Sequence, residues 1–539
     1  MKKTMKQHSF TSQLKSLAVV FGVALAFASC ANEDVAQNPT NPNEDNDKNL
    51  TTFVAGDEAK TRTSLDYNSS DFSWEAGDYI YVKDDDGVLR KSTNAPTQKV
   101  ASFKYKVPGK FTVSSSYKVY YLGKNSNGSQ VTISTAQTQT KPDNTEHFGT
   151  AGDYGTATAT KVTGKNQFAF ELEHQPAYLV FQPYTSNTIL HNCYLTGVEV
   201  TSDNDIAETY TVNTTTGALD ASTVTNGNKI VLTTKDPTWG SSNYNGFPLT
   251  NNAASVSTNG AYMVIKPGTH ILKVRYWVKD VATNVEGTIT KTLPATAYAS
   301  NTYYDMTANL NVRDYDGDHY YMWDAKEQYW KGHEWWSANK DQPVLNNRDN
   351  SNYAQNNSDP RYWNESYPGL GVSNPATHTP CKDLPNANEM SWYAMYGDPR
   401  RDNDELWTTM GHLYKGGMWF KKKSVLQAEH HYDTEKSADG TTDMRTTYKN
   451  YKNTNSSINS GLPSAADAGN YFYLPALGFY KGGEQSSVGF DGYYWSSSAH
   501  PRLSSGAYLL YFYSNRVFVD YYFRLFGYRA QKFSDFGDN

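Results

Sequence analysis

The sequence has few cysteines, no excess of positive charge and only one long hydrophobic run. Its 539 residues include three cysteines, Cys30, Cys193 and Cys381, so no disulfide framework is implied. The net charge of -6, with charged residues at 19%, excludes the basic surface by which proteins bind nucleic acid. The hydrophobic run, residues 17–28, is too short to cross a bilayer as a mature helix.

Motifs that would indicate catalysis are also missing. The chain has no Gly-x-Ser-x-Gly elbow, no phosphate-cradling glycine loop and no histidine pair with the spacing of a helical zinc site. Asp314, Asp316 and Asp318 have the alternation with which a calcium loop begins, but Ala325 stands where the loop needs a bidentate Glu. We therefore expect no enzyme and no cofactor. A polar interdomain turn is the preferred interpretation of the three aspartates, and calcium is the alternative.

The N-terminal segment, residues 1–29, has the features of a signal peptide. Four lysines precede the hydrophobic run, which ends in Ala26-Phe27-Ala28-Ser29-Cys30. This pattern resembles a bacterial lipoprotein signal, which implies lipidation of Cys30 and a surface-exposed location on the outer membrane. An ordinary signal peptide with an incidental cysteine is the alternative. Residues 30–50 are rich in Asn, Asp and Pro and predict a flexible tether.

Residues 51–310 predict an all-β region. Short alternating segments such as residues 79–82, 117–122, 168–172, 177–181 and 271–278 are separated by turn residues, which is typical of β-sandwiches. A compositional dip at residues 156–167 predicts a boundary between two sandwiches, residues 51–165 and 166–310. Residues 211–229 read as a loop.

Two motifs in this region carry a family resemblance. Lys60-Thr61-Arg62-Thr63, followed by Phe72-Ser73-Trp74-Glu75-Ala76-Gly77-Asp78, resembles the opening of fimbrillin-like proteins. The resemblance implies two transthyretin-like sandwiches, other pilus subunits as partners and proteolytic cleavage after Arg62. The alternative is that Arg62 is a solvated strand residue.

From residue 311 the composition changes, and nine of the twelve Trp residues lie beyond this point. Asn386 as N-cap and Gly397 as terminator predict a helix over residues 387–396. A second helix is expected over residues 405–414, followed by a polar insertion, residues 433–464, after which strands resume at Tyr471. Residues 311–539 therefore predict a separate α+β domain.

Three motifs of this domain resemble a second family. They are Leu-Pro-Asn-Ala-Asn-Glu-Met at residues 384–390, Phe-Tyr-Leu-Pro-Ala-Leu-Gly at 472–478 and Gly-Tyr-Tyr-Trp-Ser-Ser-Ser at 492–498. They are similar to the C-type-lectin-fold, formylglycine-generating-enzyme-like domain of variable bacterial proteins. Several members are diversified by retroelements that rewrite adenines in the 3′ end of the gene. The related oxidase chemistry needs a reactive cysteine pair, whereas Cys381 is the one cysteine of this domain.

The C-terminal segment is unusually aromatic, with nine aromatic residues among the eighteen from Tyr511 to Tyr528. Rewriting the adenines of an AAC codon can never produce Glu, Lys, Gln, Met or Trp. None of these five types occurs between Ser496 and Ala530, which favours diversification, although a strand-rich segment would also lack Lys and Glu.

The resemblance and the alternation together divide the segment into two sets of residues. The scaffold is predicted to comprise Trp495, Ala507, Leu510, Phe512, Arg524 and Gly527, with Val517 and Val519 pointing inward. The predicted ligand-binding set is His500, Arg502, Leu503, Tyr508, Leu509, Tyr511, Tyr513, Asn515, Arg516, Phe518, Asp520, Tyr521, Tyr522, Phe523, Leu525 and Phe526. From Tyr508 to Phe526, the aromatic, leucine and aspartate members of this set are expected to face solvent. An aromatic strand pair packed within the chain is the alternative.

We expect a multidomain surface adhesin or receptor, with two sandwiches as a stalk and a C-terminal binding domain that a pilus tip would carry. Its ligand would be a protein or glycan on another cell, a host surface or a phage. A structural pilus or envelope subunit, whose C-terminal aromatics contact the next subunit, is the rival interpretation. A lectin that stacks sugars on Tyr and Trp is a third.

Overall fold

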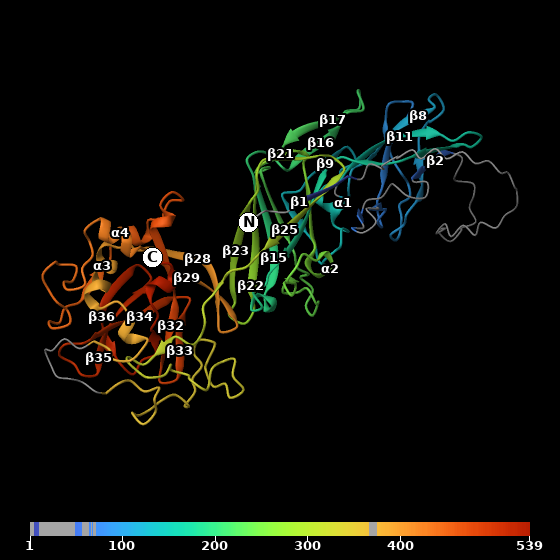
Figure 1. Ribbon diagram of the computed structural model, residues 1–539. Helices are drawn as coiled ribbons and strands as arrows, with labels where there is room; N and C mark the ends of the chain where they lie inside the picture. The colour runs from blue at the N-terminus through green and yellow to red at the C-terminus, as the bar shows by residue number, and fades with distance from the viewer. Residues whose placement is uncertain are drawn as a thin grey trace, which may run out of the picture. The chain divides into compact units, whose positions relative to one another are not determined.

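The computed structural model describes residues 5–9, 49–55, 64–65, 67, 72–124, 126–365 and 375–538 (Figure 1). The chain is mostly β-sheet and forms two compact units, which confirms the strand-rich, multidomain prediction. The first unit is Met1–Val278 with Ile289–Leu310, and the second is Lys279–Thr288 with Asn311–Asn539. The predicted sites Cys30 and Arg62 lie outside the described residues. No helix in the described ranges is long and apolar enough to cross a membrane.

The first unit begins with a large sheet built around buried aromatic residues. Its strand order is β6-β5-β8-β11-β12-β2-β7, and β13 also pairs with β11. Phe53 and Phe168 are register partners on β2 and β12, and their rings stack with centroids 5.2 Å apart. The strands are β2 (Leu50–Ala55), β5 (Ile80–Lys83), β6 (Leu89–Lys91), β7 (Phe103–Pro108), β8 (Ser116–Tyr121), β11 (Gly155–Lys161), β12 (Gln167–Phe170) and β13 (Glu173–His174), with β3 (Ser64–Leu65) and β4 (Phe72–Ser73) as a separate pair.

The rest of the first unit contains a sheet ordered β1-β25-β14-β20 and a sheet ordered β10-β18-β15-β22-β23. Strand β14 is buried at seven consecutive positions, as expected for a strand covered on both faces. The elements are β1 (Met5–Ser9), β10 (Ala136–Thr138), α1 (Phe148–Ala151), β14 (Ala177–Tyr184), β15 (Tyr194–Ser202), β18 (Lys229–Thr233), β19 (Phe247–Pro248), α2 (Val256–Asn259), β20 (Ala261–Ile265), β21 (Gly268–His270), β22 (Leu272–Asp280), β23 (Val285–Thr292), β24 (Thr296–Tyr298) and β25 (Thr302–Asn309).

The sheets of this unit do not divide where the composition changes. Strand β11 lies almost wholly within the compositional dip and pairs with β12, which begins at the end of the dip. Strand β10, from the earlier half, pairs with β18. The loop predicted over residues 211–229 is wrong. Strands β16 (Glu208–Val212) and β17 (Leu219–Thr223) form a hairpin there, and β9 (Gln130–Thr132) pairs with β16. Strand β17 is almost fully exposed, so its polar sequence carries no burial pattern.

The second unit is built on two sheets, and their strands from β28 onward appear in orange and red in Figure 1. One is ordered β26-β28-β29-β31, and the other β27-β37-β34-β35-β36-β30 with β32 and β33 attached. The strands are β26 (Arg313–Asp314), β27 (Tyr320–Tyr321), β28 (Arg400–Thr409), β29 (His412–Lys421), β30 (Tyr451–Asn453), β31 (Tyr471–Pro475), β32 (Leu477–Lys481), β33 (Glu484–Val488), β34 (Asp491–Ala499), β35 (Gly506–Tyr513), β36 (Arg516–Phe523) and β37 (Tyr528–Arg529). The helices are α3 (Ala387–Tyr396) and α4 (Lys423–Ala428).

The helix predicted over residues 387–396 is confirmed as α3. The side chain of Asn386 accepts a hydrogen bond from the Glu389 N–H, and the Glu389 side chain accepts one from the Asn386 N–H, which completes a capping box. The helix ends at Gly397 as expected. Most of α3 is buried, so it forms the support on which one face of the second sheet packs.

The helix predicted over residues 405–414 is wrong, because these residues form the hairpin of β28 and β29. Met410 and Gly411 make the turn with φ angles of 47° and 82°. Nor do Gly416 and Gly417 end an element, since both lie within β29. A Cβ atom at Gly417 would lie 2.4 Å from the carbonyl oxygen of Leu474, so the close approach of two strands requires glycine there.

Candidate ligand-binding face

The predicted site lies on three antiparallel strands, β34, β35 and β36, which are neighbours in the second sheet (Figure 1). Tyr511 on β35 stands opposite Tyr493 on β34 and opposite Phe518 on β36. Strands β35 and β36 are joined by a tight turn in which Ser514 has a φ angle of 50°. Because side chains alternate along a strand, the three strands present two different faces.

One face packs against α3 and forms the core of the unit. Phe512, Val517 and Val519 are completely buried on this face, which confirms the inward direction predicted for the two valines. The predicted scaffold residues Trp495, Ala507, Leu510, Arg524 and Gly527 are buried as well. The register of the three strands is therefore fixed by burial, since a slip of one residue would exchange the two faces.

The opposite face carries a continuous layer of stacked rings, which we call the aromatic layer. It comprises Phe479, Tyr493, Tyr511, Tyr513, Phe518, Tyr522, Phe526 and Tyr528. The ring centroids of Tyr528 and Tyr493 are 4.9 Å apart, those of Tyr493 and Tyr511 5.6 Å, and those of Tyr511 and Phe518 4.7 Å. The three pairs are close to parallel, with interplanar angles of 13°, 6° and 5°. Offset stacking of this kind adds stability beyond the burial of apolar area.

Four of the ligand-binding residues that were predicted to face solvent are buried in the structure. Tyr508 and Leu509 are completely buried, Tyr511 is 8% exposed and Phe526 is 9% exposed. Strand β35 lies inside the sheet and is covered on both faces. Its side chains therefore alternate between two buried cores, and neither side faces solvent. The prediction of solvent exposure is therefore wrong for these four residues.

The remaining predicted residues form the accessible part of the segment. Phe523 and Leu525 are exposed, at 48% and 38% of their surface, and Tyr513, Phe518 and Tyr522 are half-buried at the edge of the aromatic layer. We call these five residues the aromatic edge. The polar residues Arg502, Asn515 and Arg516 are exposed, and Leu503, Asp520 and Tyr521 are half-buried. A ligand can contact the aromatic edge without any movement of the buried rings.

Cations surround the aromatic layer. The ammonium nitrogen of Lys452 lies 5.8 Å from the ring centroid of Phe518, and that of Lys481 lies 5.4 Å from the ring of Phe526. The guanidinium carbon of Arg516 lies 6.0 Å from the ring of Tyr513. Cations at this distance from a ring face are attracted by its quadrupole. Lys452 and Lys481 were not in the predicted set.

Lys452 reaches the site because the polar insertion folds back onto the sheet. Strand β30 lies within this insertion and pairs with β36, which places Lys452 opposite Phe518. Tyr448, from the same insertion, contacts the rings of His500 and Tyr521 at centroid distances of 4.9 and 5.8 Å. The one sequence signal for this contact is the pair of aromatic residues, Tyr448 and Tyr451, within an otherwise polar stretch.

His500 is buried beside this insertion, although it belongs to the predicted ligand-binding set. Its ring lies 4.3 Å from that of Tyr521, and its Nδ1 accepts a hydrogen bond from the backbone N–H of Arg502. Burial lowers the pKa of His500 to about 4, and the nearby cations Arg502 and Arg524 act in the same direction. At neutral pH His500 is therefore uncharged and acts as a support for the turn that follows β34.

Arg524 holds the end of β36 from inside the protein. Its guanidinium group lies 4.3 Å from the ring of Trp323 and 5.6 Å from that of Trp363. Its Nε donates to the Gly506 carbonyl at 3.0 Å, and its Nη1 donates to the Asn364 carbonyl at 3.3 Å. These contacts agree with the scaffold position predicted for Arg524.

Among the described residues, one cluster has donor atoms close enough together to hold a metal ion. It lies in the acidic turn near residue 316 and comprises Asp316, Asp318 and His319. Nδ1 of His319 lies 2.7 Å from Asp316 and 2.9 Å from Asp318, and Arg529 lies 3.4 Å from Asp316. Burial opposes a charge on His319, but the hydrogen bonds to both aspartates raise its pKa to about 9. The carboxylates are thus already neutralised by two cations of the protein. Asp314 lies apart and accepts a hydrogen bond from Thr408.

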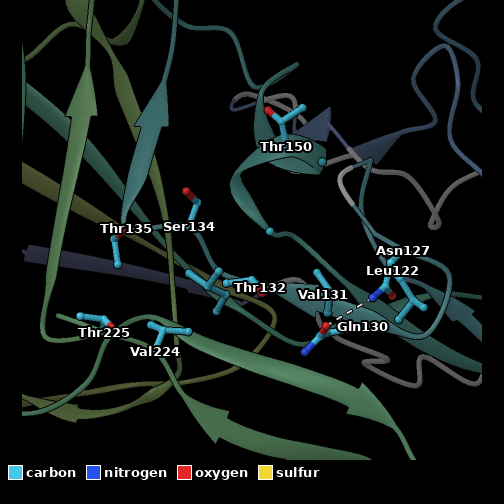
Figure 2. A pocket seen from close by; sticks show the side chains of 13 residues that line it. Leu122, Asn127, Gln130, Val131, Thr132, Ser134, Thr135, Thr150, Val224 and Thr225 are labelled. Atoms are coloured by element: carbon cyan, nitrogen blue, oxygen red, sulfur yellow. Dashed lines mark hydrogen bonds between the residues drawn. The ribbon is translucent and has the colours of Figure 1, made fainter.

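Two further features bear on catalysis. Cys381 is completely buried, and burial raises the pKa of its thiol to about 12, so the thiol is not activated as a nucleophile. A cavity in the first unit has a volume of about 300 Å³. Figure 2 shows side chains that line it, among them Thr132, Ser134 and Thr150. All of its lining residues are uncharged, and in Figure 2 Asn127 donates a hydrogen bond to Gln130. Neither feature supplies acid–base chemistry.

No protein-family model matches the chain, and no curated protein matches it in sequence. Several solved structures are similar at low identity, among them the following three. The match to a fimbrial protein from Bacteroides ovatus has 12% identity and a TM-score of 0.23, and covers 89% of this chain and 98% of that chain. The match to a Bacteroides ovatus protein designated a cell adhesion protein has 13% identity and a TM-score of 0.30, and covers 49% and 93%. The match to the fimbrial anchor protein Mfa2 from Porphyromonas gingivalis has 15% identity and a TM-score of 0.22, and covers 45% and 82%. TM-scores this low establish no common fold.

Proposed function

We propose that the chain is a bacterial surface lipoprotein that binds a protein or glycan ligand through the aromatic edge of its C-terminal domain. The β-rich first unit acts as a stalk, carried on the outer membrane through Cys30 or at a pilus tip. The rival interpretation, a structural subunit, would use the same aromatic edge as a fixed contact with the next subunit.

The observation that carries this proposal is that one continuous layer of stacked rings begins in the buried core and ends at the surface. Tyr511 is almost fully buried and stacks on Phe518, which is half-buried, and Phe518 in turn lies 5.5 Å from the ring of Tyr513. Rings held in this way have little rotational freedom left to lose when a ligand binds. Rigid Tyr and Phe side chains are the typical contact residues of binding surfaces for the same reason.

The polar surroundings supply the means of selecting a ligand. Arg516 and Lys452 lie over two rings of the aromatic edge, while the carboxylate of Asp520 accepts hydrogen bonds from Tyr448 and Asn450 at 3.3 Å each. Charged groups at the rim of an interface determine partner choice and association rate more than affinity. An aromatic centre with charges of both signs at its rim is the usual composition of a protein-binding surface.

Diversification of this segment predicts a specific pattern of variation. Arg502, Asn515, Phe523 and Leu525 are exposed, so substitutions there leave the core intact. Tyr508 and Leu509 are buried and should vary only among apolar or aromatic residues, if they vary at all. The buried scaffold residues should remain fixed, because a change there would disturb the packing against α3 or against Trp323.

Deep sequencing of the 3′ end of the gene in one growing population tests this proposal. We expect substitutions confined to template adenines, frequent at the exposed codons and rare at Leu510, Phe512 and Val519. An invariant segment with no nearby template copy would contradict diversification and favour the fixed subunit contact. Substitutions spread equally over buried and exposed codons would contradict the assignment of the aromatic edge as the selected surface.

A further inference from the structure

A second pocket of the C-terminal domain lies on the other sheet, away from the aromatic edge. Its volume is about 300 Å³. Its lining residues come from β26, β28, β29 and β31, from the residues that directly follow β26 and β29, and from the 3-10 helix Phe533–Phe536 with the glycine after it. This volume is at the lower end of the range for small-molecule sites. None of the residues predicted from the sequence to bind ligand lines it.

One wall of the pocket exists because β29 carries a glycine. A Cβ atom at Gly417 would lie 2.4 Å from the hydroxyl oxygen of Tyr473, so the absence of a side chain lets the tyrosine ring lie across the strand. The ring of Trp419 stands beside it, with centroids 5.1 Å apart and an interplanar angle of 51°. Trp419 is half-buried and can therefore offer part of its ring to a ligand.

Tyr315 and Phe536 also line the pocket, and their ring centroids are 5.8 Å apart. The guanidinium carbon of Arg313 lies 4.8 Å from the centroid of Tyr315 and 5.9 Å from that of Phe536. Arg313 also donates a hydrogen bond to the backbone carbonyl of Asp535, which fixes the position of the guanidinium group. The cation thus lies against two of the rings that line the pocket.

Of the three charged residues that line the pocket, two are cations. Arg313 and Lys422 both line the pocket, and neither forms an ion pair with a carboxylate among the residues that the structure describes. The one acidic lining residue is Glu405, at the irregular part of β28. Although Glu405 is exposed as a residue, desolvation of its carboxyl group and the charge of Asp402 raise its pKa. A group that resists ionisation opposes an anion less strongly than an ordinary carboxylate does.

Tyr473 gives the second, independent indication of a ligand. It lines the pocket with only 7% of its surface exposed. The indole N–H of Trp407 lies close to its hydroxyl oxygen but can only donate, so the hydroxyl hydrogen has no acceptor among the described residues. An unpaired buried hydroxyl destabilises the folded protein, because it has lost its hydrogen bonds to water. A polar ligand in the pocket would remove this cost by accepting the hydrogen bond.

We propose that this pocket binds a carboxylated sugar ring, with the carboxylate between Arg313 and Lys422. The apolar face of the sugar packs on Trp419, and a ring hydroxyl or the ring oxygen accepts from Tyr473. Arg and Lys are the side chains that recognise carboxylates, and an aromatic lining with a few convergent polar groups is typical of small-ligand sites. Uronic and sialic acids share this chemistry.

Binding is measured by isothermal titration and by saturation-transfer NMR on the full chain. The probes are methyl glucuronide, N-acetylneuraminic acid and neutral methyl glucoside. We expect at least one of the acids to bind about tenfold more tightly than the glucoside, as removal of one charge-assisted hydrogen bond predicts. Saturation by the glucuronide alone or by the sialic acid alone identifies which acid the pocket accepts. Equal affinity for the acids and the glucoside, or no saturable binding of either acid, would overturn the proposal.

Three variants locate the site. Lys422→Gln and Tyr473→Phe should each weaken binding of the acid by about five- to tenfold. Tyr473→Phe should also leave the thermal midpoint unchanged or higher, because it removes an unpaired buried hydroxyl, so a folding defect cannot imitate the result. Lys382→Gln, at an exposed position outside the pocket, is the matched control and should bind like the wild type. Undiminished binding by Tyr473→Phe, or equal loss in Lys382→Gln, would refute the assignment.

Discussion

The ring of Tyr511 lies parallel to that of Phe518 on the adjacent strand, with centroids 4.7 Å apart and planes 5° from parallel. The two residues are direct register partners, so the backbone hydrogen bonds of β35 and β36 hold the stack in place. Tyr511 is buried and Phe518 reaches the surface. One pair thus joins the part of the segment that stabilises the fold to the part that a ligand can contact.

The first prediction separates these two parts. Tyr511→Ala should lower the free energy of unfolding of the C-terminal domain by about 3–5 kcal/mol, because it removes a buried ring that touches several others. Phe523→Ala, on the aromatic edge, should cost less than about 1 kcal/mol. Urea unfolding followed by tryptophan fluorescence measures both. Similar losses in the two variants would contradict the division into buried layer and accessible edge.

The arrangement of strands in this segment could be predicted from the sequence, but the exposure of its residues could not. Alternation correctly identified Val517 and Val519 as inward-pointing, since they pack against α3. The consecutive residues Tyr508 and Leu509 were expected in solvent because they lie between the scaffold positions, yet both are buried. Periodicity shows that two faces differ, whereas the cover on each face comes from segments distant in sequence.

The insertion shows why the complete site could not be predicted. Lys452 reaches Phe518 only because residues 451–453 add a strand to the sheet, and nothing local to β36 indicates that pairing. The helix α3 could be predicted because its capping box is local in sequence. The hairpin at residues 400–421 could not be predicted in this way. In the sequence Gly416 and Gly417 resemble a helix stop, and only the neighbouring strand packed against Gly417 shows that they belong to a strand.

Arg524 provides a prediction about the scaffold. Arg524→Lys should destabilise the C-terminal domain by about 2–4 kcal/mol, although it keeps the charge. An ammonium group cannot stack as a plane on Trp323 while it donates to both the Gly506 and the Asn364 carbonyl groups. Thermal unfolding checks the loss. Arg516→Lys, at an exposed position, is the control and should unfold like the wild type.

His500 predicts a pH dependence of stability. Its pKa is lowered from 6.5 to about 4 in the folded protein, so the unfolded chain takes up the proton first as the pH falls. The contribution of His500 is therefore complete above about pH 6.5 and is lost progressively as the pH falls to about 4. Tyr448, Tyr508 and Tyr521 face the ring, and Asp520 opposes the shift without reversing it.

The measurement compares His500→Phe with the wild type in urea at a series of pH values from 7 to 4. We expect the wild type to lose stability more steeply than the variant over this interval, because phenylalanine keeps the ring contacts but binds no proton. His430→Asn, at an exposed position, should retain the wild-type slope. Parallel curves for His500→Phe and the wild type would show that His500 does not carry the pH dependence.

Gly417 provides the last prediction, which concerns the support of the second pocket. Gly417→Ala places a methyl group 2.4 Å from the Leu474 carbonyl oxygen and 2.4 Å from the Tyr473 ring, so both β31 and the ring must shift. We expect a loss of about 1–3 kcal/mol, as for other overpacked sites, and a change in the fluorescence of the adjacent Trp419. Gly469→Ala is the matched control, because a Cβ atom there meets nothing within 4 Å. Near-ultraviolet circular dichroism and thermal unfolding measure both variants. If Gly417→Ala kept the wild-type midpoint and spectrum, Tyr473 would not need the glycine beneath it, and the wall of the pocket would not depend on this position.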